Sequence, residues 1–266
     1  MNQKPKILII EDDPVVLALH TSAVEDEFSV ITSEDAKTAW DIFCKSEDIN
    51  VVIMDIQLPD MNGLELADKM YSFQPDTRII FISGMMNEIH SLETLKTDFY
   101  CLLKPIVPSY VTLTAKLALS DWNKIKRYGN IKSSAVELSI DKSILIVDDD
   151  PIILENHVAS LDGFLNVLQA SDGLEAWNLY NNEIGNVAVV VTDIEMPGMD
   201  GKTLIKKIRS VSKETQIIAI TGILDDDLSE VLYQLDVKCL PKPIHPIFVR
   251  IGVYSALRRY WQYSRD

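Results

Sequence analysis

The sequence is internally duplicated: four short segments of its first half recur, in the same order, in its second half. ILIIEDDP (7–14) recurs as ILIVDDDP (144–151), VVIMDIQLPDMNG (51–63) as VVVTDIEMPGMDG (189–201), RIIFISG (78–84) as QIIAITG (216–222), and CLLKPI (101–106) as CLPKPI (239–244). The first pair is offset by 137 residues and the other three by 138, so one insertion or deletion separates the copies. A period this long predicts two copies of one domain and excludes an array of short repeats.

Length and composition agree with two globular domains. At roughly 150 residues per domain, a chain of 266 residues is expected to form about two. Hydrophobic residues make up 47% of the chain and charged residues 24%, which is typical of folded proteins and not of disordered ones. The net charge of −15 argues against broad attraction to nucleic acid or to anionic lipid, because both require a cationic surface.

Targeting and cross-linking features are missing from the sequence, which favours a cytoplasmic protein. No apolar run reaches the roughly 18 residues that a transmembrane helix needs, and the N-terminus lacks the apolar core of a signal peptide. Cys44, Cys101 and Cys239 are widely spaced and form no CxxC pair, which is typical of reduced thiols and not of a disulfide or zinc framework. We therefore expect a soluble cytoplasmic protein with no membrane partner.

Each half alternates predicted strands and helices, a pattern typical of an α/β domain with a parallel sheet. The runs around Val51 and Ile79 are continuous and β-branched, as in strands that are covered on both faces. In the first half, strands are predicted at Lys6–Ile10, Phe28–Thr32, Val51–Met54, Ile79–Ile82 and Tyr100–Leu103, and helices at Val15–Glu27, Asp35–Ser46, Leu64–Phe73, Asn87–Leu95 and Ser109–Tyr128. We expect two doubly wound α/β domains with five-stranded parallel sheets, at residues 1–128 and 143–266, joined by a linker at 129–142.

Polar residues follow the predicted strands in both halves, at the edge where a doubly wound sheet places its ligand site. Two acids follow the first strand, an aspartate ends the third, a hydroxyl residue ends the fourth, and a Lys-Pro pair follows the fifth. These residues are Glu11, Asp12, Asp55, Ser83 and Lys104 in the first half, and Asp148, Asp149, Asp193, Thr221 and Lys242 in the second.

This set of side chains suits phosphoryl transfer to an aspartate. Three carboxylates in one crevice repel one another, and a divalent cation relieves that repulsion; few protein ligands and retained waters suit Mg²⁺ better than Ca²⁺. A lysine opposite the acids binds a phosphoryl oxygen as a point charge, and a nearby hydroxyl donates a hydrogen bond to the same group. The aspartate that ends the third strand is then the nucleophile that accepts the phosphoryl group.

At these residues the chain resembles, twice over, the receiver domain of response regulators in two-component signalling, of the chemotaxis-regulator type. The resemblance implies the flavodoxin-like (βα)5 fold and its strand order. It implies that Asp55 and Asp193 accept a phosphoryl group from the phosphohistidine of a sensor histidine kinase or a histidine phosphotransfer protein. It also implies that Ser83 and Thr221 are the switch hydroxyls and that Lys104 and Lys242 bind the phosphate. The implied direct ligands of Mg²⁺ are Asp12 and Asp149, the two phosphoacceptors, and the main-chain carbonyls of Gln57 and Glu195. Glu11 and Asp148 would bind the ion through water.

The sequence departs from the family pattern at two places. Receivers usually carry Tyr or Phe three residues before the lysine, and this position holds Cys101 in the first half and Cys239 in the second. Tyr100 lies one residue away, where alternation along a strand points it to the other face of the sheet. Glu195 adds a carboxylate beside the second phosphoacceptor where the first half has neutral Gln57, so we expect the two aspartyl phosphates to differ in lifetime.

Two histidines, His20 and His157, occupy equivalent positions, eight residues after Asp12 and Asp149. A phosphotransfer histidine would need an exposed position on a helical bundle. We therefore expect these two side chains to pack within the helix layer or to lie at the surface, without a role in phosphoryl transfer.

The leading hypothesis is a phosphorelay response regulator with no enzymatic activity beyond its own phosphorylation and dephosphorylation. Because the sequence ends with the predicted fifth helix of the second domain, we expect no direct DNA binding, and output through phosphorylation-dependent binding to an effector protein or between receivers. The alternative is the regulatory part of a larger enzyme such as a diguanylate cyclase. A phosphatase of the haloacid-dehalogenase type is disfavoured, because that family needs a second aspartate two residues after its nucleophile, where this chain has Gln57 and Glu195.

Overall fold

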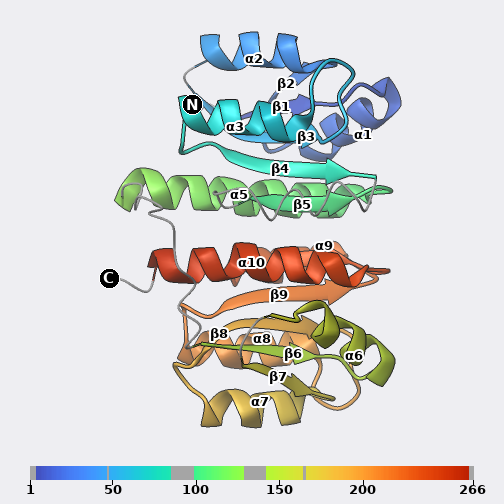
Figure 1. Cartoon of the computed structure of the whole chain (residues 1–266), viewed down its shortest axis with the longest axis vertical. Helices are drawn as coiled ribbons and strands as arrows, with labels where there is room; N and C mark the ends of the chain where they lie inside the picture. Colours follow the sequence, from blue (N-terminus) through green and yellow to red (C-terminus); the bar gives the residue numbers. More distant parts are fainter. Residues whose placement is uncertain (1–3, 47, 85–98, 129–141, 164–165, 264–266) are drawn as a thin grey trace. The chain divides into compact units, whose positions relative to one another are not determined.

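The computed structural model of the chain describes residues 4–46, 48–84, 99–128, 142–163 and 166–263 (Figure 1). The chain divides into two compact units, Met1–Lys132 (unit 1) and Ser133–Asp266 (unit 2), each with its own sheet. The predicted helix at Asn87–Leu95 lies outside the described residues, and so does the predicted linker at 129–142 apart from Lys142. None of the described helices combines the length and the apolar character that crossing a membrane requires.

Unit 1 is built on a sheet of five parallel strands in the order β2-β1-β3-β4-β5. The strands are β1 (Lys6–Ile10), β2 (Ser29–Ser33), β3 (Ile49–Asp55), β4 (Arg78–Ser83) and β5 (Tyr100–Leu103). The described helices are α1 (Pro14–Val24), α2 (Ala36–Lys45), α3 (Gly63–Phe73) and α5 (Pro108–Tyr128). Helix α1 packs against α5 and α2 against α3, and the two pairs cover the two faces of the sheet. This arrangement confirms the predicted doubly wound α/β fold.

Unit 2 repeats the same topology, with the strand order β7-β6-β8-β9-β10. Its strands are β6 (Ser143–Val147), β7 (Val167–Ala170), β8 (Val187–Asp193), β9 (Gln216–Thr221) and β10 (Lys238–Pro241). Its helices are α6 (Pro151–Ser160), α7 (Gly173–Asn182), α8 (Gly201–Val211), α9 (Asp226–Gln234) and α10 (Pro246–Tyr263). Helix α6 packs against α10 and α7 against α8. The duplication in the sequence is therefore a duplication of one fold.

Burial explains why the middle strands form unbroken apolar runs in the sequence. Every residue of β3, β4, β8 and β9 is buried. Because helices cover both faces of the sheet, the side chains on both faces are buried away from solvent. Each buried aliphatic side chain stabilises the fold by about 2 kcal/mol. The strands of each sheet point in one direction, so their carboxyl ends meet at one edge (Figure 1).

One predicted boundary is wrong by three residues. The helix predicted at Val15–Glu27 ends at Val24. The main-chain N–H groups of Glu27 and Phe28 both donate to the carbonyl of Val24, at 3.0 and 2.9 Å, and this turn directs the chain into β2. Phe28 is buried there, so core packing outweighs continuation of the helix.

Three acidic residues follow the first strand of each unit, at 11–13 and at 148–150, and the third of them caps the next helix. The side chains of Asp13 and Asp150 accept hydrogen bonds from the first free N–H groups of α1 and α6, and a proline follows each of them. Capping leaves the two preceding acids of each run at the strand end, where they face the sheet edge.

Candidate functional site

In unit 1 the polar residues at the strand ends converge. Asp55, the last residue of β3, is 6% exposed, and its Oδ2 accepts a hydrogen bond from Lys104 Nζ at 2.5 Å. The same ammonium group donates to Glu11 Oε1 at 2.9 Å. The other oxygen of Asp55, Oδ1, accepts a hydrogen bond from the main-chain N–H of Gln57 at 2.9 Å. Ser83 ends the neighbouring strand β4 and is fully buried.

Unit 2 places its counterparts in the same way. Asp193, the last residue of β8, is 2% exposed, and its Oδ2 accepts a hydrogen bond from Lys242 Nζ at 2.5 Å. Its Oδ1 accepts one from the main-chain N–H of Glu195 at 3.2 Å. Thr221 ends β9 and is fully buried, and its hydroxyl donates to the carbonyl of Ile223 at 2.8 Å.

The first acid of the pair is placed differently in the two units. Glu11 is bonded to Lys104, whereas Asp148 makes no ion pair with Lys242, and both of these residues belong to the described part of the chain. Asp148 is 1% exposed, and its Oδ1 accepts a hydrogen bond from the main-chain N–H of Asp150 at 3.0 Å. Asp148 Oδ2 is buried and has no hydrogen-bond partner; Glu11 Oε2 makes no hydrogen bond either, but it lies 2.9 Å from Lys104 Nζ.

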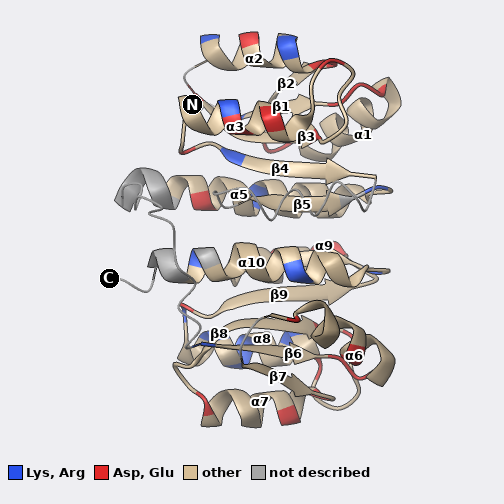
Figure 2. Ribbon diagram, in the orientation of Figure 1, with Lys and Arg blue, Asp and Glu red and all other residues tan. Residues whose placement is uncertain are grey.

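Each unit gathers three carboxylates that could share a metal ion. Acidic residues are frequent in the loops that follow the strand ends (Figure 2). Ligand oxygens of Glu11, Asp12 and Asp55 lie within 4.8 Å of one another, and so do those of Asp148, Asp149 and Asp193. In each trio the middle residue is exposed and the other two are buried. Carboxylate oxygens with one open side fit Mg²⁺, which keeps several waters and takes few ligands from the protein. The partnerless Oδ2 of Asp148 also fits a cation, because a buried polar atom is normally satisfied.

Burial and ion pairing determine the charges of the site. Burial raises the pKa of Glu11, although Lys104 beside it acts in the opposite direction. Burial raises the pKa of Asp148 to about 6, and the N–H of Asp150 and the charge of Lys242 offset this only in part. For both lysines burial favours the neutral amine, but hydrogen bonds to the carboxylates outweigh it and raise the pKa. Both lysines are therefore ammonium ions at neutral pH.

A glycine holds the loop that follows each buried aspartate. A Cβ atom at Gly63 would lie 2.3 Å from the carbonyl oxygen of Asp55, and one at Gly201 would lie 2.0 Å from that of Asp193. The main-chain N–H groups of these glycines donate to the carbonyl of the residue after the aspartate, at 2.8 and 3.0 Å. Only a residue without a side chain permits this approach, so the glycine positions the start of α3 or α8 against the aspartate.

The outer part of this loop is held differently in the two units. In unit 1 the carboxylate of Asp60 accepts hydrogen bonds from the first two N–H groups of α2, both at 2.9 Å. Unit 2 has Gly198 at the equivalent position, with a φ of +75°. At the start of α7, Gly173 takes the place that Ala36 has at the start of α2. A Cβ atom on Gly173 would lie 2.2 Å from the carbonyl oxygen of Met199. Both helices keep an aspartate N-cap, Asp35 for α2 and Asp172 for α7, but the additional carboxylate of Asp60 in unit 1 is replaced by close main-chain contact in unit 2.

The family model described as "Response regulator receiver domain" matches residues 7–116 and again residues 144–249, which is more than half of the chain. The chain belongs to the response regulator receiver family. Unit 1 is receiver 1 and unit 2 is receiver 2, and each contains one full set of the strand-end residues. The chain is therefore a two-component signalling protein with a repeated receiver domain.

Similar proteins come from several signalling systems. The "Aerobic respiration control protein ArcA" of Escherichia coli (strain K12) is 36% identical over 121 residues, which are 44% of this chain and 50% of that protein. A "Chemotaxis protein CheY homolog" of Campylobacter jejuni is 29% identical over 110 residues, which are 39% of this chain and 83% of that protein. Among solved structures, a "putative two-component system response regulator/ggdef domain protein" aligns with 97% of this chain and 100% of its own, at 20% identity and a TM-score of 0.43. This chain matches about half the length of the first of these relatives.

The position that usually holds an aromatic residue carries an inert thiol in both receivers. Burial raises the pKa of Cys101 to about 12, and burial also raises the pKa of Cys239. Both thiols stay protonated at neutral pH, which argues against redox sensing. Tyr100 is buried, and its hydroxyl donates to Asp121 of α5 at 2.5 Å. Its ring is therefore engaged with α5 and does not replace the missing aromatic residue.

The two equivalent histidines, His20 of α1 and His157 of α6, are buried, each 2% exposed. Burial is the main cause that lowers the pKa of each to about 4, and the charge of the site lysine acts in the same direction. Both imidazoles are therefore neutral at pH 7.

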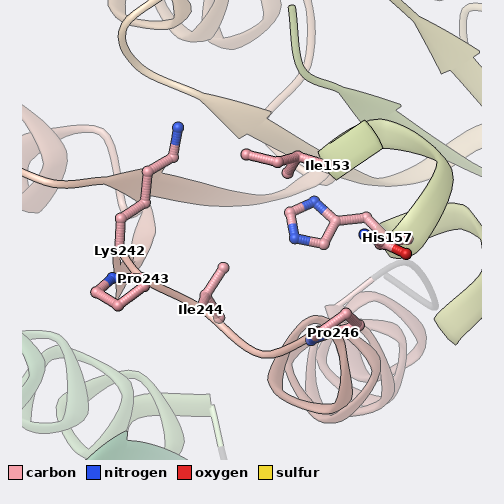
Figure 3. Close-up of a pocket in the computed structure, with 7 residues that line it drawn as sticks. Ile153, His157, Lys242, Pro243, Ile244 and Pro246 are labelled. Atoms are coloured by element: carbon pink, nitrogen blue, oxygen red, sulfur yellow. The ribbon is translucent and has the colours of Figure 1, made fainter. Parts of the chain in front are cut away.

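In receiver 2 a cavity of about 420 Å³ lies beside the site, lined by Ile153, Asn156, His157, Lys242, Pro243, Ile244 and Pro246 (Figure 3).

Replacing Asp148 by asparagine is expected to stabilise metal-free receiver 2 by about 1–2 kcal/mol at pH 7.5. The pKa of Asp148 is about 6 in the folded protein against 3.8 ordinarily, so its ionisation opposes folding above pH 6, and this cost disappears as the pH falls below 4. The full shift corresponds to about 3 kcal/mol, and residual solvation of the ionised carboxylate reduces it to about 1–2 kcal/mol.

Urea unfolding in EDTA, at pH 7.5 and at pH 4.5, measures this effect. At pH 4.5 the gain from Asp148→Asn should shrink to about a third of its value at pH 7.5. Asp149→Asn is the matched control, because Asp149 is exposed and its replacement should change stability little. A variant at Asp148 that is less stable than the parent at pH 7.5 would contradict the buried, uncompensated charge.

Proposed function

We propose that the chain is a response regulator in which Asp55 and Asp193 are each phosphorylated. The observation that carries the proposal is the common geometry of the two aspartates. Each is buried at a strand end, with a lysine ammonium 2.5 Å from one carboxylate oxygen and a main-chain N–H bonded to the other. The ammonium offsets the negative charge and the N–H fixes the rotation of the carboxylate, so the nucleophile is oriented before a donor arrives.

The remaining residues suit the chemistry of transfer. A bond forms from the carboxylate oxygen to phosphorus as the bond from phosphorus to the nitrogen of the donor's phosphohistidine breaks. Lys104 and Lys242 would hold a phosphoryl oxygen, and the buried hydroxyls of Ser83 and Thr221 would donate a hydrogen bond to another. The two acidic trios would hold Mg²⁺, which when bound neutralises charge on the transferring group.

We further propose that the donor is a histidine kinase or a histidine phosphotransfer protein in the cytoplasm, and that the output is binding to an effector protein or between receivers. Membership of the receiver family supports this class of donor. The net charge of −15 supports a protein partner and disfavours DNA. The alternative of a regulatory part within a larger enzyme stays a prediction, which the length of the natural gene tests.

Intact-mass analysis after incubation with Mg²⁺ and acetyl phosphate tests the phosphoacceptors. The full chain should gain two phosphoryl groups, Asp55→Asn and Asp193→Asn should each gain one, and the double variant none. Asp60→Asn and Asp200→Asn are matched controls, because these carboxylates lie in the same loops but cap the helices α2 and α8. Phosphorylation of the double variant, or loss of a phosphoryl group in a control, would refute the assignment.

A further inference from the structure

We propose that Glu11 and Asp148 give the two receivers different requirements for Mg²⁺, and that receiver 2 binds Mg²⁺ more tightly than receiver 1. The inference rests on the proposed function, because it concerns the same two acidic trios. At limiting Mg²⁺, receiver 2 would then be competent for phosphorylation while receiver 1 is not.

The two sites differ in the length of one buried side chain. Glu11 and Asp148 occupy equivalent positions directly after β1 and β6, and both are 1% exposed. Glutamate has one more methylene, and the carboxylate of Glu11 reaches across the crevice until both of its oxygens lie 2.9 Å from Lys104 Nζ. Lys104 is therefore shared between Glu11 and Asp55.

Receiver 2 lacks this second contact. Lys242 contacts Asp193 at 2.5 Å and makes no ion pair with Asp148, two residues that the structure describes fully. Asp148 Oδ1 accepts one hydrogen bond from the N–H of Asp150, and Oδ2 accepts none although it is buried. The shorter side chain stops short of the lysine, so one buried carboxylate oxygen still needs a positive partner.

This difference changes what a divalent cation gains on binding. In receiver 1, Mg²⁺ that draws on Glu11 meets a carboxylate already bonded to an ammonium group, and the two cations repel each other. In receiver 2 the cation supplies the missing partner of a buried carboxylate. The net contribution of one hydrogen bond to a charged group corresponds to about a tenfold change in an equilibrium constant. We therefore expect the half-saturating Mg²⁺ concentration to be about tenfold lower for receiver 2.

The structure offers a separate reporter for each site in the intact chain. The main-chain N–H of Gln57 donates to Asp55, and that of Glu195 donates to Asp193. Their amide resonances in ¹⁵N-labelled full-length protein can be followed during titration with MgCl₂ at constant ionic strength, without a phosphodonor. The Glu195 resonance should reach half of its shift at about a tenfold lower Mg²⁺ concentration than the Gln57 resonance.

Exchanging the two side chains should exchange the two affinities. Glu11→Asp should lower the midpoint at Gln57 by up to about tenfold, and Asp148→Glu should raise the midpoint at Glu195 by a similar factor. Each variant carries the residue that the other receiver has at this position, and the amide spectrum itself shows whether it is folded. In each variant the midpoint of the unaltered receiver should stay constant.

A second difference between the receivers needs its own control. Glu195 adds an exposed carboxylate to receiver 2, where receiver 1 has Gln57. Glu195→Gln should leave most of the difference in midpoints, because exposed charges are screened. If Glu195→Gln abolishes the difference while Glu11→Asp and Asp148→Glu change nothing, the inference is wrong. Equal midpoints in the unaltered chain would also refute the inference, but they would not contradict the proposed function. If neither resonance shifts with Mg²⁺, the metal sites of the proposed function are refuted as well.

Discussion

Replacing Gly201 by alanine is expected to destabilise receiver 2 by about 3 kcal/mol, at the upper end of overpacking costs. The new Cβ atom would lie 2.0 Å from the carbonyl oxygen of Asp193 and 2.8 Å from the Cα atom of Ile194. Both are main-chain atoms that can move only if the strand end or the helix start moves. Helix propensity alone predicts the opposite sign, because alanine is favoured over glycine in a helix by about 1 kcal/mol. The direction of the change therefore decides between the two effects.

Hydrogen exchange resolved to the peptides of each receiver measures the opening free energy of receiver 2 separately from that of receiver 1. Gly222→Ala is the matched control, because a Cβ atom there would meet nothing nearer than the Cβ atom of Lys242 at 3.9 Å. Gly63→Ala should repeat the effect in receiver 1, where the distance to the carbonyl oxygen of Asp55 would be 2.3 Å. If Gly201→Ala slows exchange in receiver 2, the close approach does not limit this position.

Acidification from pH 7 to pH 4 is expected to destabilise each receiver by about 2 kcal/mol through its buried histidine. Burial lowers the pKa of His20 and of His157 from 6.5 to about 4. Since the pKa is depressed in the folded state, the stabilising contribution of the neutral imidazole is fully present above pH 6.5 and is lost as the pH falls to 4. The full shift corresponds to about 3.4 kcal/mol, and residual solvation of the charged form reduces it to about 2 kcal/mol.

His20→Leu and His157→Leu isolate this contribution, because leucine keeps an apolar side chain at the buried position and does not titrate. Urea unfolding at pH 7 and at pH 4 should show a smaller acid loss in each variant than in the parent, by about 2 kcal/mol and only in the receiver that carries the change. Carboxylates titrate in all three proteins, so their effect cancels in the comparison. An equal acid loss in parent and variants would show that the histidines accept protons without opposing folding.

Much of the fold and the composition of the site can be predicted from the sequence, because residues that follow the strands of a parallel sheet all lie at the same edge of that sheet. Asp55 and Lys104 are far apart in sequence, but each follows a buried apolar run, and parallel strands end at one edge. The same reasoning in the second copy finds Asp193 and Lys242. Because the domain is duplicated, each motif is observed twice, and a residue that matches the motif by chance in one half is not expected to match it in the other.

Side-chain reach and burial could not be predicted in the same way. The sequence shows glutamate at one position and aspartate at its equivalent, but whether a lysine lies within 2.9 Å depends on distances that no pattern encodes. Arg259 is a further case, since it stands in a run of basic and aromatic residues near the end of α10. It is only 2% exposed and donates two hydrogen bonds to Asp236, at 3.0 and 2.9 Å. Tertiary packing, and not the local pattern, places this guanidinium in the interior.

The two ways of holding the loop after the phosphoacceptor have a consequence for genetic exchange between the copies. Ala36 with Asp60 and Gly173 with Gly198 are matched pairs: the first joins helix and loop through a carboxylate, the second through main-chain proximity. A crossover that joins Ala36 to the loop of receiver 2 would put a methyl group against the carbonyl oxygen of Met199 and would lose the two hydrogen bonds that Asp60 accepts, whereas the reverse crossover would keep both the glycine and the carboxylate. Recombination between the two halves of this gene is therefore expected to be tolerated in one direction more than in the other, so that exchange of sequence between the copies is asymmetric.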